Sequence, residues 1–159
     1  MIVHTYALTA PVSPSAVWRH WVDVDQWTDH FPGLASARLN GPVAIGAVGL
    51  IKPDRGPRWS FRISAVDRVK KRFAIERKVL FGVVRLEFAL ERPEEAEDAE
   101  NAAAFDPPLQ ASPDAWSMVY TVTITGPLAV VYDRFAGRPI AKQLPDLSTS
   151  VAAASPIDD

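Results

Sequence analysis

The alternation of apolar and polar positions near the start of the chain predicts a strand followed by two short helices. Residues 2–10 alternate with a period of two, which is typical of a strand with one buried face. Ser13 and Pro14 then suit the N-cap and the first position of a helix. Asp23 suits the N-cap of a second short helix, which the sequence Phe31-Pro-Gly33 closes.

From residue 35 onward the chain again alternates between apolar and polar side chains. The segments between these runs are short and rich in proline, glycine or charged residues, which favours tight turns between antiparallel neighbours. We therefore expect consecutive strands that form a curved meander. The predicted strands are residues 38–40, 45–52, 58–64, 72–79, 83–91 and 116–124.

The last part of the chain predicts a long amphipathic helix. Gly126-Pro127 suits its start, and apolar residues follow at spacings near 3.6. Pro139 and Pro145 interrupt the pattern, because an interior proline removes a helix hydrogen bond. We expect a kink or break near residues 137–139. The apolar stripe consists of Leu128, Val131, Tyr132, Phe135, Ile140, Leu144, Leu147 and Val151.

This order of elements indicates the fold class. The helix has one large apolar surface to pack on, which is the concave face of the meander. We predict an α+β domain in which a curved antiparallel sheet of about six or seven strands wraps around a long C-terminal helix, with two short helices after the first strand.

Composition and charge exclude several classes of protein. The chain has 159 residues and no cysteine, which excludes a disulfide framework, a thiol nucleophile and any Cys-ligated metal. A net charge of −2 argues against a general nucleic-acid binder. The start of the chain does not resemble a signal peptide, and the most apolar stretch, residues 41–51, is too short to span a bilayer. We expect a cytoplasmic protein with no transmembrane segment.

Several short motifs together point to a known superfamily. On these residues the chain resembles the START-like, or SRPBCC, superfamily, whose helix-grip fold is shared by polyketide cyclases, lipid-transfer domains and the birch-pollen allergen group. It is most similar to the bacterial polyketide cyclase/dehydrase-like branch. The matching stretches are Leu8-Thr-Ala-Pro11, Ala16-Val-Trp18, Trp21-Val-Asp-Val-Asp-Gln-Trp27, Phe31-Pro-Gly33, Leu39-Asn-Gly41-Pro with Gly46, Trp59-Ser-Phe61 and Thr125-Gly-Pro-Leu128.

The resemblance covers residues 2–152 apart from an acidic insertion, and it implies a domain organisation. Residues 1–154 are expected to form a single START-like ligand-binding domain, with a frayed tail at 155–159. Residues 92–114 depart from the family's short turn, and their composition predicts a flexible acidic hairpin extension. Without residues 91–101 the chain carries a net charge of +3, so the body is mildly basic.

The superfamily implies a cavity for an apolar small molecule between the sheet and the last helix. Pockets of this kind are mostly apolar with few polar groups. The alternative interpretation is that the aromatic residues of the concave face fill the core. The predicted ligand-binding residues are Trp59, Phe61, Ile75, Arg77, Phe88, Met118, Tyr120, Tyr132 and Phe135.

Arg77 is the most informative of these residues. It has the phase of Phe73, Ile75 and Val79, so regular pleating points it inward. A buried arginine needs a partner, and a ligand carboxylate or phenolate would accept two hydrogen bonds from it. The alternative is a register shift at the strand end that exposes the side chain.

His30 and Tyr120 are the candidate catalytic residues. His30 precedes the loop into the sheet, near the expected mouth of the cavity, where it could act as an acid or base. Tyr120 could donate a hydrogen bond to a ligand carbonyl or enolate. Structural roles for His4, His20 and His30 are the alternative, because none of them has metal-ligand spacing. We predict no metal and no cofactor.

The sequence leaves three functions open. The first is binding of a hydrophobic or aromatic small molecule, lipid-like or polyketide-like, in the cavity. The second is an aromatic polyketide cyclase or dehydratase that uses the same cavity. The third is an interaction module that contacts a protein through the sheet or the acidic extension. A fold by itself does not decide among them. The sequence does not indicate the oligomeric state.

Overall fold

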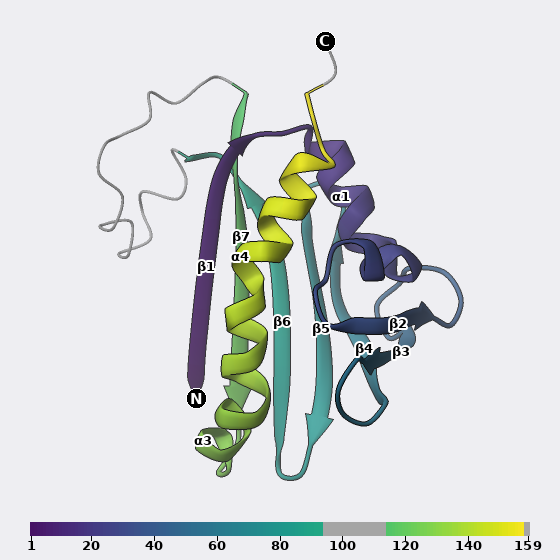
Figure 1. Ribbon diagram of the computed structural model, residues 1–159, viewed down its shortest axis with the longest axis vertical. Helices are drawn as coiled ribbons and strands as arrows, with labels where there is room; N and C mark the ends of the chain where they lie inside the picture. Colours follow the sequence, from purple (N-terminus) through teal and green to yellow (C-terminus); the bar gives the residue numbers. More distant parts are fainter. Residues whose placement is uncertain (94–113, 158–159) are drawn as a thin grey trace.

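The computed structural model describes residues 1–93 and 114–157, and these form a single antiparallel sheet with helices on one face (Figure 1). The sheet has seven strands in the order β1-β7-β6-β5-β4-β3-β2. The strands are β1 (Ile2–Pro11), β2 (Leu34–Leu39), β3 (Val48–Pro53), β4 (Trp59–Asp67), β5 (Arg72–Val79), β6 (Gly82–Glu91) and β7 (Ala115–Thr125). The helices are α1 (Pro14–Val22), the 3₁₀ helix η1 (Val24–Asp29), α3 (Ala129–Tyr132), the π-helical turn η2 (Asp133–Gly137) and α4 (Arg138–Ala153).

The two predicted short helices lie between β1 and β2. At the start of α1 the Oγ atom of Ser13 accepts a hydrogen bond from the N–H of Ala16 at 3.4 Å, which confirms Ser13 as the N-cap. Asp23 occupies the predicted N-cap position of η1, but its side chain makes no hydrogen bond to that helix. Asp25 instead accepts a hydrogen bond from the N–H of Leu39 at 3.2 Å, which ties η1 to β2.

The C-terminal helix changes its geometry just before residues 137–139, where the sequence predicts a kink or break, but the chain stays helical there, because Gly137 and Arg138 keep right-handed helical backbone angles. A π-helical turn fills residues 133–137, and Pro139 follows it in the first turn of α4. Pro145 lies inside α4 without ending it. A π-helical turn holds more residues than an α-helical one, so the faces before and after it are rotated relative to each other. Val131 and Phe135 are consequently exposed, whereas Leu144, Leu147 and Val151 are buried.

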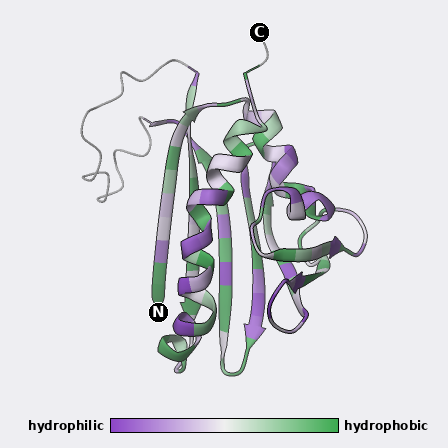
Figure 2. Cartoon of the chain, viewed as in Figure 1, coloured by the Kyte–Doolittle hydropathy of each residue, from purple (hydrophilic) through white to green (hydrophobic). Residues whose placement is uncertain are grey.

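The predicted α+β architecture is confirmed. The long helix crosses the concave side of the sheet, and Figure 2 shows hydrophilic residues on the side of α4 that faces away from the strands. The first residue of the predicted tail is tied down: Ser155 is buried, and its carbonyl accepts a hydrogen bond from the N–H of Ser13 at 3.0 Å. Most of the predicted acidic extension, residues 94–113, lies outside the described residues, as do residues 158–159.

No helix within residues 1–93 and 114–157 combines the length and the apolar character that a membrane crossing requires.

Candidate functional site

One half of the space between sheet and helix is filled by aromatic rings. Phe88 lies at its centre, with ring centroids 5.7 Å from Trp21, 5.7 Å from Phe73 and 5.6 Å from Tyr120. The ring centroid of Trp27 lies 6.1 Å from that of Phe88, and the Trp27 ring stacks on Phe61 of β4. All six rings are essentially inaccessible to solvent. We call these residues the aromatic cluster, and it leaves no room for a ligand.

The other half contains a cavity of about 240 Å³. It lies between β3, β4, β5 and β6 on one side and η2 with the first turns of α4 on the other, and η1 and β2 close one end. A smaller hollow of about 40 Å³ shares six of its wall residues and extends it toward Val84. The walls consist of Trp27, Phe31, Gly33, Leu34, Ile51, Pro53, Arg55, Trp59, Ile75, Arg77, Leu86, Phe135, Ala136, Pro139, Ile140 and Gln143.

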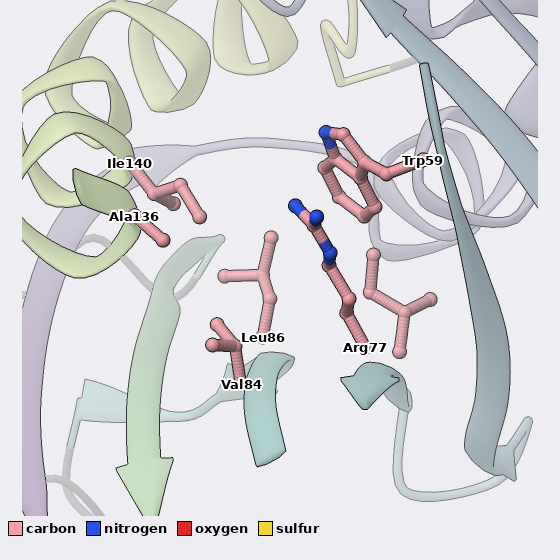
Figure 3. A pocket seen from close by; sticks show the side chains of 7 residues that line it. Trp59, Arg77, Val84, Leu86, Ala136 and Ile140 are labelled. Carbon is pink, nitrogen blue, oxygen red and sulfur yellow. The ribbon is translucent and has the colours of Figure 1, made fainter. Parts of the chain in front are cut away.

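Arg77 enters this cavity from β5. It lies two residues beyond the buried Ile75, so the pleat points both side chains to the concave face. Figure 3 shows its guanidinium beside the ring of Trp59, across from Ala136 and Ile140, and the Cζ atom lies 4.8 Å from the ring centroid. A cation over a tryptophan face is attracted by the negative charge of the ring surface.

The guanidinium of Arg77 has no acidic partner in the part of the chain that the structure describes. Burial lowers the pKa of Arg77, and the nearby Tyr132 opposes this shift. The remaining polar wall residues are Arg55 and Gln143, and no Asp or Glu of the described residues lines the cavity. The cavity is therefore apolar with a positive charge at one side, an arrangement that attracts an anionic group.

The residues predicted to bind a ligand fall into two groups. Trp59, Ile75, Arg77 and Phe135 line the cavity. The other predicted residues are not among its wall residues: Phe61, Phe88, Met118 and Tyr120 are buried in the core, and Tyr132 is half-buried against it. A ligand contact remains a prediction for every residue in both groups.

The two predicted catalytic residues lie apart from the cavity walls. The hydroxyl of Tyr120 accepts a hydrogen bond from the indole N–H of Trp21 at 3.3 Å, and burial raises the pKa of Tyr120 to about 12. His30 lies beside α1 and α4, with Nε2 3.1 Å from Nδ1 of His20 and Nδ1 3.1 Å from Oγ of Ser150. Their catalytic roles stay predictions.

Some residues that line the cavity were not predicted from the sequence. Leu86 and Ile140 belong to the apolar stripes of their elements, but nothing in the pattern separated them from neighbours that fill the core. Gly33 and Arg55 lie in loops, where no periodicity indicates a direction. Within residues 1–93 and 114–157, no three His, Asp or Glu side chains gather to hold a metal ion.

Comparison with known proteins identifies the fold. No protein-family model and no curated protein matches the sequence of this chain. Norcoclaurine synthase from Thalictrum flavum, in complex with dopamine and hydroxybenzaldehyde, superposes with a TM-score of 0.66 at 10% identity, over 96% of this chain and 84% of that chain. The Zhui aromatase/cyclase from Streptomyces sp. R1128 gives 0.64 at 15% identity, over 96% and 93% of the two chains.

A third structure, a protein from Thermobifida fusca solved by NMR, gives a TM-score of 0.66 at 13% identity over 100% of this chain and 99% of that chain. This chain has the helix-grip fold. The expected likeness to the SRPBCC and polyketide cyclase-like proteins is confirmed at the level of fold. Sequence identities this low support a shared fold and nothing more. The function of this helix-grip chain must therefore be inferred from its own cavity.

Proposed function

We propose that this helix-grip protein binds a small apolar molecule that carries an acidic group, with Arg77 holding the acid. One observation carries the proposal: a partly buried arginine points into a mostly apolar cavity and has no acidic partner among the described residues. Buried charges in proteins are normally paired. A ligand carboxylate or phenolate would complete this site, because the planar guanidinium matches two acceptor oxygens.

The size of the cavity narrows the class of ligand. Pockets for drug-sized molecules measure about 300–1,000 Å³, and the cavity here, about 240 Å³, lies just below that range. A molecule of one or two rings is therefore the expected occupant. The ligands named for the Thalictrum flavum enzyme, dopamine and hydroxybenzaldehyde, are single-ring aromatic compounds and support this size class.

The cyclase or dehydratase hypothesis rests on the fold of the Zhui aromatase/cyclase. General acid–base catalysis needs a titratable group within hydrogen-bond reach of the substrate. The described cavity walls contain no His, Asp, Glu or Tyr, and a long poly-keto chain exceeds the available volume. Binding is therefore the better-supported function. The acidic extension, on which the interaction-module hypothesis depends, lies largely outside the described residues.

The test compares naphthoate with neutral naphthamide as probes. We expect naphthoate to raise the melting temperature of the protein, since a ligand that binds only the folded state stabilises it. Arg77→Gln should weaken naphthoate binding about tenfold while naphthamide binding stays the same, because one charged hydrogen-bonding pair is lost. Arg62→Gln is the matched control, since Arg62 is exposed on β4 in the phase opposite to Phe61 and Ile63.

Two results would count against the proposal. The first is that neither probe stabilises the protein and native mass spectrometry of fresh protein detects no retained small molecule. The second is an equal loss of naphthoate and naphthamide binding in Arg77→Gln, which would mean that Arg77 only supports the wall.

A further inference from the structure

Six large apolar side chains are exposed together at one end of the molecule. Phe81 and Leu80, in the turn between β5 and β6, are 71% and 64% exposed, and Val130 and Phe135 are each 75% exposed. Monomeric proteins rarely expose apolar residues in a group without a function. We call this group the apolar tip; it comprises Leu80, Phe81, Leu128, Val130, Val131 and Phe135.

The parts of the apolar tip form one surface. The β5–β6 turn and α3 lie at the same end of the sheet (Figure 1). Gly126, which precedes α3, packs against this turn so closely that a Cβ atom there would lie 2.2 Å from the carbonyl oxygen of Phe81. Figure 2 shows α3 as a hydrophobic segment at this end. The tip is thus built from the β5–β6 turn, α3 with the residue before it, and η2.

The backbone of Phe81 adds a second observation. Its φ angle is +59°, in the left-handed region where glycine and asparagine are the usual residues. A phenylalanine there is strained, and its exposed ring gains little from packing inside the protein. The strain is understandable if the ring packs against something outside the chain.

Basic residues surround the apolar tip. Residues 78–82 and 126–138, a range that leaves out the cavity residue Arg77, hold three basic residues and one acidic residue, a net charge of +2, whereas the whole chain has −2. The single acid, Asp133, is 3% exposed and already paired: Oδ1 lies 2.5 Å from Nε2 of His4, and Oδ2 accepts a hydrogen bond from Nε of Arg138 at 2.9 Å. Lys78 and Arg134 remain exposed beside the tip.

We propose that the apolar tip docks the protein on the surface of an anionic lipid bilayer. Apolar and aromatic side chains at this end would enter the headgroup region, and the neighbouring Lys and Arg side chains would face acidic headgroups. The charge complementarity favours an anionic surface over a neutral one.

The position of Phe135 connects this surface to the cavity. Phe135 belongs to the apolar tip and also lines the cavity, so the wall of the cavity reaches the docked face. An acidic apolar molecule dissolved in the bilayer would then reach Arg77 without crossing much water. This delivery step rests on the proposed function, whereas the docking itself does not.

The test is flotation of the full chain with phosphatidylcholine vesicles, with and without phosphatidylserine. We expect binding to the phosphatidylserine vesicles that weakens as salt screens the charges. The double variant Leu80→Ser with Phe81→Asn should reduce the bound fraction about tenfold, because less apolar surface enters the bilayer. Asparagine tolerates the left-handed backbone at this position, so the variant keeps the turn.

Val69→Ser is the matched control. Val69 is 92% exposed in the basic turn between β4 and β5, next to Arg68, Lys70 and Lys71, and its loss should leave flotation unchanged. Lys78→Glu with Arg134→Glu should abolish the preference for phosphatidylserine.

Three results would overturn the docking proposal. They are equal binding to both kinds of vesicle, unchanged flotation of the Leu80→Ser, Phe81→Asn variant, and no flotation at all. A dimer that this variant dissociates in sedimentation velocity, together with no flotation, would assign the apolar tip to a second copy of the chain. Arg77→Gln should float normally, and the tip variant should bind soluble naphthoate normally, so the two proposals fail separately.

Discussion

The two ends of the space under α4 are built differently although they share the same sheet and the same helix. On β6, Phe88 is surrounded by aromatic rings, whereas Leu86, two residues away on the same face, lines the cavity. The helical segment contributes the buried Leu144 and Leu147 to the filled half, and Phe135, Ala136, Pro139, Ile140 and Gln143 to the cavity walls. Under one helix and on one face of β6, the identity and direction of the side chains therefore decide which half stays open.

The filled half also receives a tryptophan that the hollow half does not. Trp21 packs from α1 onto the sheet beside Phe88, whereas Trp27 from η1 borders both halves, because it lies against Phe88 and also lines the cavity. The hollow half is covered by loops and the π-helical turn, and the side chains around it leave a cavity of about 240 Å³. We therefore expect the filled half to supply most of the stability and the hollow half to supply the binding.

The largest expected effect concerns Phe88 and Leu86. Phe88→Ala should lower the free energy of unfolding by about 3–5 kcal/mol, because it leaves a void among rings that cannot close it. Leu86→Ala should cost about 2 kcal/mol or less, since Leu86 already borders empty space and loses fewer contacts. Urea unfolding measures both values.

The outcome tests the comparison directly. Equal losses for Phe88→Ala and Leu86→Ala would show that both halves are packed to the same density. In that case the cavity would not mark a difference in function between them.

A smaller effect is expected when the cavity is filled. Ala136→Leu places a longer side chain in the wall that both hollows share. The free energy of unfolding should change by less than about 1 kcal/mol, because the added atoms occupy existing space. The rise in melting temperature caused by naphthoate should disappear.

Ala153→Leu is the control for this experiment, since Ala153 is exposed near the end of α4 and far along the helix from the cavity. Naphthoate binding that survives in Ala136→Leu would place the ligand elsewhere on the protein.

The sequence predicted the strands, the short helices and the inward direction of Trp59 and Arg77, because alternation records which face a side chain takes. The alternation does not indicate where along the strand the cavity lies. The sequence therefore could not distinguish Leu86, which lines the cavity, from Phe88, which fills the core. The prediction of an apolar stripe on the last helix used the α-helical spacing near 3.6 residues for the whole segment. The π-helical turn changes the phase, which is why Phe135 lies at the rim, 75% exposed, although its spacing predicted an inward position.

The smallest expected effect is a pH dependence confined to the filled half. His20 Nε2–H donates to the carbonyl of Ala154 at 3.0 Å, so its Nδ1 accepts from Nε2–H of His30 at 3.1 Å. Nδ1 of His30 is then left to accept from the hydroxyl of Ser150 at 3.1 Å. This chain joins α1, the loop after η1 and the end of α4.

Burial, and then the neighbouring His20, lowers the pKa of His30 below its ordinary value of 6.5. Below pH 6.5 the unfolded chain therefore binds a proton more readily than the folded one. Stability is full above this pH and falls as the pH drops from 6.5 toward the folded pKa. Because the ring is only partly buried, solvent screening keeps the loss below about 1 kcal/mol.

Urea unfolding on both sides of pH 6.5 measures this dependence. His30→Gln should flatten it, because the glutamine amide can still donate to His20 but does not titrate. An unchanged slope in this variant would assign the pH dependence to another group. Naphthoate binding should not follow the same profile, since no histidine lines the cavity walls that the structure describes, and a shared profile would mean that the two halves are coupled.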